Sequence, residues 1–478
     1  MSPTISPPPH GRSPMARRTV LQSLLAAPLL VGAAGSLTGC GRRAGDGPEQ
    51  AYPVAKSTVT REPVDPRQGT LVGVRTATAR LSSGLLRTLA PAPPRENLLI
   101  SPYSIVMALT MAGIGAKGET ERAFSAVLNG PPTFGERPLT SDLLLRESLP
   151  ISCNALAQQL ASYAGEIDWN GEKVNIAWSE ANSLWGQNGT PWQQPFLDDI
   201  AHYFGGGMHQ VDYIRDAEAA RTAINGWTKE ATAGKIPEII AEGMLNDLSR
   251  LVLVNAVHFK APWASPFDQS QTQPAPFTRP DGGRLDVPMM RGKAVGVESG
   301  PGQPGFTAVR LDYAGLKFAF TAVLPAQGQE KAVHEFMLTG IGDIMAGLRG
   351  SQDQQPGPTS EVYPASLAMP RFSLDYSAAL KEPLIELGLG SAFDSERADF
   401  SGMTTAERLF IAFVAHQATM DVDEEGTEAA AATAVGMEAM SAPAKVLDVT
   451  LDRPFYVILH DTETDTPLFL GYVADPSG

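Results

Sequence analysis

The sequence is short of basic residues. Its 478 residues include 37 lysines and arginines against 52 aspartates and glutamates, and its formal net charge is −15. No cluster of basic residues follows the N-terminal region. Because proteins that bind a phosphate backbone carry such clusters, we do not expect nucleic acid among the partners of this chain.

The motifs of common hydrolases and metal sites are also missing. The chain contains no Gly-x-Ser-x-Gly sequence, which carries the nucleophile of many hydrolases, and no His-Glu-x-x-His sequence, which binds zinc. Its seven histidines are scattered, and neither His202 nor His209 has a suitable acidic cluster beside it. We therefore predict no catalytic centre, no metal and no other cofactor.

No apolar run is long and unbroken enough for a convincing membrane-spanning helix. The best candidate, Val20–Leu37, is interrupted by Pro28 and by several glycines. It follows a twin arginine at positions 17 and 18, which is typical of export by the Tat route. We therefore interpret residues 1–39 as a signal peptide, with Met15 as an alternative start.

The sequence contains only two cysteines, and the first of them, Cys40, ends the apolar segment. The tetrapeptide Leu37-Thr38-Gly39-Cys40 is similar to the lipobox of bacterial lipoproteins, in which the cysteine carries the lipid. The alternative is a plain signal peptide with a chance cysteine. If Cys40 is the lipidated first residue, Cys153 stands alone and the mature chain cannot form an intrachain disulfide.

Residues 40–66 are polar and rich in proline and glycine, which predicts a flexible tether. The folded domain is then expected over residues 67–478. A lipidated Cys40 would hold this domain on the outer face of the cytoplasmic membrane. Without the lipid, the protein would be released into the extracellular space.

Hydrophobic patterns predict helices first and strands later in this domain. Because strands and helices do not alternate regularly, this order favours an α+β fold. The predicted helices are Gly73–Leu89, Ser101–Gly113, Glu119–Val127, Cys153–Tyr163, Phe196–Phe204 and Ala217–Thr232. The predicted strands are Arg250–Phe259, Gly305–Leu311, Lys317–Leu324, Ala365–Phe372, Phe410–Val422, Val446–Leu451, Tyr456–His460 and Leu468–Val473.

The segment Asp423–Val435 is the most informative part of the chain, because small residues follow its acidic start. Locally it could form a helix, since Thr427 is a good cap and alanine has the best helix propensity. However, no apolar residues recur at helical spacing to dock such a helix. On an extended strand, Glu428 would lie on the outer face. The residues facing the core would be Thr427, Ala429, Ala431, Thr433 and Val435.

About ten short motifs occur in order over residues 70–478. They are Asn97–Ser104, Gly118–Thr120, Ile224–Trp227, Thr232–Ile236, Leu253–Trp263, Val287–Met290, Met369–Phe372, Leu387–Gly388, Ala398–Gly402, Asp452–Phe455 and Pro467–Gly471. Together with the hinge-like segment, this order resembles the serpin family of serine protease inhibitors. One such motif would be weak support, but the whole series makes a chance match improbable.

The resemblance implies a serpin fold, which has helices, three β-sheets and an exposed reactive-centre loop. It implies an inhibitor of serine-type endopeptidases rather than an enzyme. The target protease would cleave the loop and form an acyl-enzyme. The cleaved loop would then insert into a sheet as a new strand and trap the protease in a covalent complex.

The resemblance also implies the residues of the reactive loop. The reactive bond is expected between Met440 and Ser441, since Ser441 lies fifteen residues after Gly426. A cut at Ala439, Ala442 or Ala444 stays open, because this region varies in length within the family. The hinge is expected at Glu424, Gly426, Thr427, Glu428, Ala429, Ala430, Ala431 and Ala432.

The side chain at the reactive bond predicts the class of target. The flexible thioether of Met440 suits an apolar specificity pocket and cannot pair with a buried acid. Elastase-, chymotrypsin- or subtilisin-like proteases are therefore expected rather than trypsin-like ones.

Further positions match the part of the serpin sheet that opens. The shutter is expected at Ser101, Ser104, Asn255 and His416, where a buried polar network could re-pair as strands separate. His416 could equally be a core histidine whose ring nitrogens have ordinary hydrogen-bond partners, and Ser104 could be an ordinary helix residue. Trp263, together with Glu424, matches the breach, where insertion begins.

The implied partners are a target serine protease and, through lipidated Cys40, the membrane. Some serpins carry a heparin-binding helix near Asn154–Lys173, but Lys173 is its only base here, so no heparin is expected. The protein is expected to be a monomer. One alternative is a non-inhibitory serpin, although such members usually lose the small hinge residues. Another is a membrane-tethered solute-binding lipoprotein, which does not account for the ordered motifs.

Overall fold

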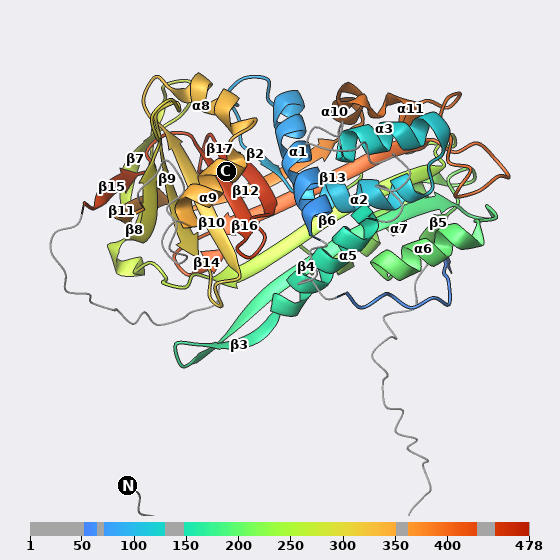
Figure 1. The fold of residues 1–478 in the computed structure, drawn as a ribbon, viewed down its shortest axis with the longest axis horizontal. Helices are drawn as coiled ribbons and strands as arrows, with labels where there is room; N and C mark the ends of the chain where they lie inside the picture. Colours follow the sequence, from blue (N-terminus) through green and yellow to red (C-terminus); the bar gives the residue numbers. More distant parts are fainter. Residues whose placement is uncertain (1–51, 65–70, 130–147, 350–361, 428–444, 478) are drawn as a thin grey trace, which may run out of the picture. The chain divides into compact units, whose positions relative to one another are not determined.

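The structure is a computed structural model that describes residues 52–64, 71–129, 148–349, 362–427 and 445–477. These residues belong to a compact unit from Ala51 to Gly478, in which helices pack on β-sheets (Figure 1). The predicted signal peptide and Cys40 lie outside the described residues. Among the described helices, none is long and apolar enough to span a membrane.

The first sheet has eight strands, and β6 (Leu251–Pro262) lies near its middle. Nearly every side chain of β6 is buried, as expected for a strand with helices on both faces. The other strands in spatial order are β1 (Val54–Ala55), β5 (Met208–Val211), β4 (Glu172–Gln187), then β6, and beyond it β14 (Gly426–Thr427), β13 (Ile411–Val422) and β12 (Phe372–Ala379). β3 (Gly165–Trp169) pairs with β4 outside this order.

Alternate residues of β6 belong to two hydrophobic clusters. Leu251, Leu253 and Val257 join the main core, which includes the fully buried helix α2 (Pro102–Ile114). Val252 and Val254 join a smaller cluster with α7 (Ala217–Ala231). We call the side of the sheet under α7 the outer face, and the side under α2 the core face.

The second sheet has nine strands. They are joined by β8 (Arg284–Glu298), which pairs with β7 at one end, with β11 in its middle and with β9 at the other end. The strands in order are β15 (Leu447–Thr450), β11 (Tyr363–Pro370), β8, β9 (Phe306–Asp312), β10 (Phe318–Pro325), β16 (Phe455–Asp461), β17 (Pro467–Val473) and β2 (Leu98–Ile100), with β7 (Gln273–Thr278) beside β8.

The helices confirm the expectation of an α+β fold. α2 begins after Ser101, whose hydroxyl accepts the N–H of Ser104, and Pro102 suits the first turn because no N–H is needed there. The remaining helices are α1 (Val72–Leu89), α3 (Gly118–Leu128), α5 (Leu149–Tyr163), α6 (Gln194–Phe204), α8 (Glu330–Met337), α9 (Ile341–Arg349), α10 (Lys381–Leu384) and α11 (Gly390–Phe393), with short segments η2 (Gln269–Gln271) and η3 (Ile385–Leu389). Each predicted helix and strand is present, with its ends displaced by a few residues.

The tether predicted for residues 40–66 is wrong for residues 52–64. Val54 and Ala55 form β1, which pairs antiparallel with β5 at the edge of the first sheet. The Tyr52 ring lies 4.6 Å from that of the buried Trp185, and Arg61 Nε donates to Asn154 Oδ1 of α5 at 2.7 Å. These contacts add the segment to the folded unit, although its apolar residues form no periodic pattern.

Candidate functional site

β14 lies between β6 and β13 at one end of the first sheet (Figure 1). Thr427 pairs antiparallel with Val422 of β13 and with Ala261 of β6. Farther along, β6 and β13 pair directly with each other in parallel, as far as Val257 and Ala418. The chain therefore turns back after β13 and enters the sheet where its two central strands diverge.

A tight turn directs the chain into this position. The Asp423 carboxylate accepts the N–H groups of Glu425 and Gly426 at 2.9 and 3.1 Å. A Cβ on Gly426 would lie 2.2 Å from the carbonyl oxygen of Ala261. Only glycine permits so close an approach of two backbones, which explains why the predicted hinge has a glycine at this position.

Trp263 holds the turn from the side of β6. Its N–H donates to the Glu425 carbonyl at 2.8 Å, and its Nε1 donates to the Asp423 carbonyl at 2.9 Å. Its indole stacks on the Tyr313 ring, with centroids 4.5 Å apart, and the Tyr313 hydroxyl lies 2.6 Å from Thr427 Oγ1. Thr427 is buried on the core face, as the alternation predicts, and Trp263 lies beside the hinge.

Glu424 is anchored by a bidentate ion pair. Arg371 donates to both of its carboxylate oxygens, at 2.8 and 2.7 Å, and the Thr272 hydroxyl donates at 2.6 Å. Burial would raise the pKa of Glu424, but the hydrogen bonds from Arg371 and Thr272 outweigh it and lower that pKa. The carboxylate is therefore charged and fixes the start of the hinge.

The predicted shutter residues meet in one buried network on the core face. The N–H of Ser101 donates to His416 Nε2 at 3.1 Å, and His416 Nδ1 lies 2.6 Å from Asn255 Oδ1. The Asn255 amide donates to the Ser104 hydroxyl, and the Ser101 hydroxyl donates to the Leu468 carbonyl at 2.7 Å. The network joins α2 to β6, β13 and β17.

The hydrogen bonds define the state of the His416 ring. Because a backbone N–H donates to Nε2, that nitrogen carries no proton, so Nδ1 carries it and donates to Asn255. Burial lowers the pKa of His416 to about 3. The neutral ring thus bridges β13 and β6, the two strands that diverge at β14.

Sequence reasoning missed the contribution of β4 to this network. Asn182 Oδ1 accepts hydrogen bonds from Asn255 and from Ser104, so the row continues across three strands. Two residues earlier, the partly buried Glu180 accepts from the Tyr103 hydroxyl and from Trp178 Nε1, both at 2.8 Å. Burial raises the pKa of Glu180. The polar residues spaced along β4 were the available signal in the sequence. They do not predict a buried strand, because buried strands are usually apolar.

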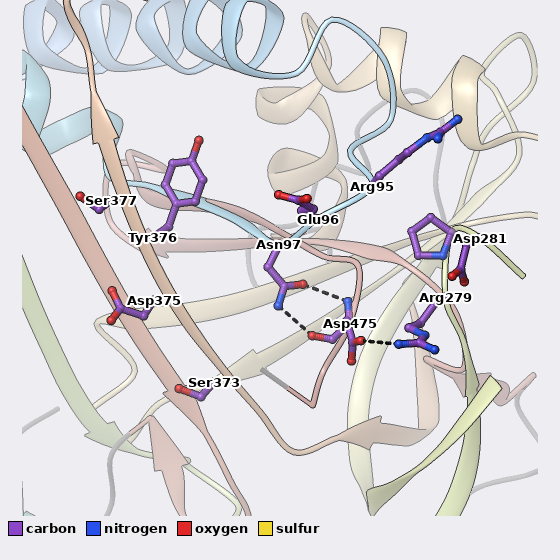
Figure 2. Close-up of a pocket in the computed structure, with 11 residues that line it drawn as sticks. Arg95, Glu96, Asn97, Arg279, Asp281, Ser373, Asp375, Tyr376, Ser377 and Asp475 are labelled. Carbon is purple, nitrogen blue, oxygen red and sulfur yellow. Dashed lines mark hydrogen bonds and ion pairs between the residues drawn. The ribbon is translucent and has the colours of Figure 1, made fainter. Parts of the chain in front are cut away.

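A pocket of about 850 Å³ lies apart from the hinge, beside β12 (Figure 2). At its floor, Asn97 accepts the N–H groups of Ala474 and Asp475 at 2.9 Å and donates to the Asp475 carbonyl. Arg279 pairs with the Asp475 carboxylate at 3.2 Å. The asparagine that opens the first motif therefore ties β2 to the C-terminal segment.

Part of the predicted site cannot be placed. The reactive bond, Met440–Ser441, and the hinge residues Glu428 and 429–432 lie outside the described residues. The remaining predicted hinge residues, Glu424, Gly426 and Thr427, lie at the end of the sheet where Trp263 binds the carbonyls of Asp423 and Glu425. Of the predicted shutter residues, Asn255 and His416 lie farther along β6 and β13, and Ser101 and Ser104 lie at the start of α2.

Comparisons with known proteins agree with this geometry. The family model described as "Serpin (serine protease inhibitor)" matches residues 76–476. The leukocyte elastase inhibitor of Bos taurus is 33% identical over 403 residues, which cover 84% of this chain and 98% of that protein.

Two solved structures share the fold. The native state of tengpin, a thermophilic serpin, superposes with a TM-score of 0.68 at 24% identity, and the match covers 88% of this chain and 97% of tengpin. The complex of thyroxine-binding globulin with thyroxine superposes with a TM-score of 0.69 at 25% identity, covering 84% and 99% of the two chains.

Proposed function

The chain belongs to the serpin family of serine protease inhibitors, so it is an inhibitor rather than an enzyme, and we propose that it acts as a suicide substrate. The target protease attacks the reactive loop and forms an acyl-enzyme. The loop then enters the first sheet between β6 and β13 and carries the protease with it. Because catalysis requires placement within about an ångström, the resulting distortion stops deacylation.

The position of β14 carries this proposal. Thr427 already pairs with both neighbours, so continuing its register predicts the partner of every later residue in the cleaved form. Ala431 would lie opposite Val257 and Ala418, and Thr433 opposite Asn255 and His416. About a dozen new ladder hydrogen bonds at ~1 kcal/mol each would favour insertion by on the order of 10 kcal/mol.

The buried network suits this opening. Insertion must separate His416 from Asn255. This would break the hydrogen bond between His416 Nδ1 and Asn255 Oδ1 and leave these two buried atoms without a partner. Thr433 would enter the same row of the sheet, and its hydroxyl can both accept and donate. It could therefore restore a bond to each of the two residues, which supports a role for Ser101, Ser104, Asn255 and His416 as the shutter.

The proposed targets are elastase-, chymotrypsin- or subtilisin-like serine proteases. Met440 supports this class, since its thioether fits an apolar pocket. The name of the bovine relative, leukocyte elastase inhibitor, points the same way. A carrier role is the second candidate, because thyroxine-binding globulin shares the fold, but the small residues after Thr427 favour inhibition.

We further propose that a lipid on Cys40 holds the inhibitor at the outer face of the cytoplasmic membrane. The link that remains is shorter than the predicted tether, since the folded unit begins at Ala51. Eleven residues, Gly41–Ala51, reach at most about 40 Å. Heparin is not a proposed activator, because Lys173 pairs with Glu166 at 3.3 Å and has no basic neighbour in that segment.

A trapping experiment tests the proposed function. The mature chain is incubated with an elastase-like, a chymotrypsin-like and a subtilisin-like protease and then run on a denaturing gel. We expect a covalent complex with at least one of them, and mass spectrometry of the released C-terminal peptide should place the cut after Met440. Complete cleavage by all three without any complex would exclude the mechanism.

A further inference from the structure

A cluster of charges lies on the outer face of the first sheet at the point where β6 and β13 diverge. The parallel pairing ends at Val257 and Ala418, and β14 begins at Ala261. The residues between are His258–Lys260 on β6 and Thr419–Asp421 on β13. Phe259 and Met420 belong to the main core, so His258, Lys260, Thr419 and Asp421 share the outer face.

Lys235 reaches this cluster from the segment that follows α7. Its Nζ lies 3.7 Å from Asp421 Oδ2. Burial first, and then the ammonium groups of Lys235 and Lys260, lower the pKa of His258, so both lysines lie near its ring. Within the described part of the chain, Lys260 has no carboxylate partner.

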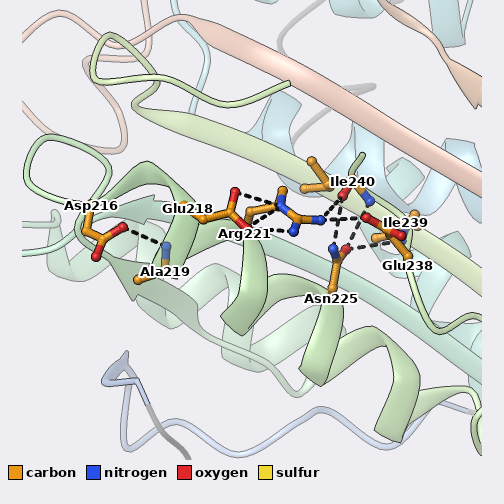
Figure 3. Close-up of polar contacts among 8 residues, drawn as sticks. All are labelled: Asp216, Glu218, Ala219, Arg221, Asn225, Glu238, Ile239 and Ile240. Carbon is orange, nitrogen blue, oxygen red and sulfur yellow. Dashed lines mark hydrogen bonds and ion pairs between the residues drawn. The ribbon is translucent and has the colours of Figure 1, made fainter. Parts of the chain in front are cut away.

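Contacts between α7 and residues 238–240 anchor the segment that follows the helix (Figure 3). Asn225 Oδ1 accepts the N–H groups of Ile239 and Ile240, at 3.1 and 3.0 Å, and its Nδ2 donates to the Ile240 carbonyl at 2.9 Å. Arg221 binds Glu238 and the same carbonyl. Lys235 lies between the end of α7 and these anchored residues, and its backbone N–H donates to the Thr232 carbonyl at 3.0 Å.

Charge and register identify the group that this cluster fits. Lys235 and Lys260 contribute two positive charges, Asp421 contributes one negative charge, and His258 is neutral. The continued register of β14 brings Glu428 opposite Lys260 on one side and Asp421 on the other. Glu428 is the first charged residue to enter and the only one between Thr427 and Met437.

We propose that Lys260 and Lys235 form a carboxylate site that receives Glu428 when the loop inserts, a role that rests on the proposed function. Lys260 pairs with Glu428 across the strands, where facing side chains come within about 5 Å. Lys235 neutralises the charge of Asp421, so the carboxylates of Asp421 and Glu428 can lie opposite each other on neighbouring strands. The site thereby favours the first step of insertion, before the small residues follow.

A double-mutant cycle tests the site through the number of inhibitor molecules cleaved per protease trapped. We expect Lys260→Gln to raise this number about two- to fivefold, the range of a cross-strand charge pair, and Glu428→Gln to do the same. The double variant should resemble either single variant. Two controls should match the wild type. Lys260→Arg keeps the charge on β6, and Lys173→Gln removes a charge from a different strand, β4.

Charge reversal provides a second test that does not depend on the stability of one variant. Glu428→Lys and Lys260→Glu should each lower trapping, and the two together should restore it. Independent, additive effects in both cycles would overturn the carboxylate site while the wild type still traps its target. If the wild type itself gains no thermal stability when its loop is cut, both the site and the proposed function fall.

Discussion

Ala431→Arg is expected to turn the inhibitor into an ordinary substrate. In the continued register of β14, residue 431 faces the core opposite Val257 and Ala418, and both of these are fully buried. An arginine there would bury an unpaired charge at a cost of several kcal/mol, and each 1.4 kcal/mol on a barrier slows a step about tenfold. The acyl-enzyme would then hydrolyse before insertion.

The readout for Ala431→Arg is the ratio of covalent complex to cleaved inhibitor on a denaturing gel. We expect complex to fall at least about tenfold while the rate of cleavage stays close to that of the wild type. Ala431→Ser, which is small and neutral, is the matched control and should trap normally. Efficient trapping by the arginine variant would show that residue 431 does not enter the sheet.

Met440→Arg is expected to move inhibition from elastase-like to trypsin-like proteases. The primary pocket of a trypsin-like protease holds a buried acid, which pairs with arginine but stays unpaired when a thioether fills the pocket. Loss of a matched buried group typically changes the discrimination between two substrates by 10²-fold or more. The association rate should therefore fall by about that factor with elastase-like proteases and rise by about that factor with trypsin-like ones.

Association rates measured with one protease of each class check this second prediction. Met440→Leu is the control, because it keeps an apolar side chain of similar size and should preserve elastase-type inhibition. Unchanged inhibition by Met440→Arg would mean that the cut lies elsewhere, at Ala439, Ala442 or Ala444. Mass spectrometry of the released peptide would then identify the bond.

The predicted hinge rests on local chemistry. Gly426 and the small residues after Thr427 are recognisable without a partner strand, and the structure explains Gly426 by its contact with Ala261. The predicted alternation places Thr427 on the core face, where it is buried against Tyr313, and residues 428–435 lie outside the described residues.

Strand β4 was missed because buried strands are usually apolar. Its buried or partly buried positions include the polar residues Glu180, Asn182 and Ser183. Glu180 and Asn182 bond to Tyr103 and Asn255, which lie far along the chain. Such hydrogen bonds cannot be read from periodicity. The same three-dimensional contacts extend the buried network beyond the four residues that were predicted as the shutter.

The N-terminal boundary was missed for a related reason. The apolar residues of the segment 52–64 form no periodic pattern, and its strand β1 has only two residues. The segment can pack here only because the sheet edge has room for its backbone. A Cβ at Gly207 would lie 2.5 Å from the carbonyl oxygen of Ala55, so the close approach requires a glycine at position 207. A local composition rich in proline and polar residues cannot show that such a surface exists.

The most direct measurement is the melting temperature of the wild-type chain before and after its loop is cut by a protease that it does not trap. If the severed strand joins the sheet, about 10 kcal/mol of added stability should raise the melting temperature by roughly 10–20 °C in a chain of this size. A cut chain that melts at the same temperature as the intact one would contradict the account.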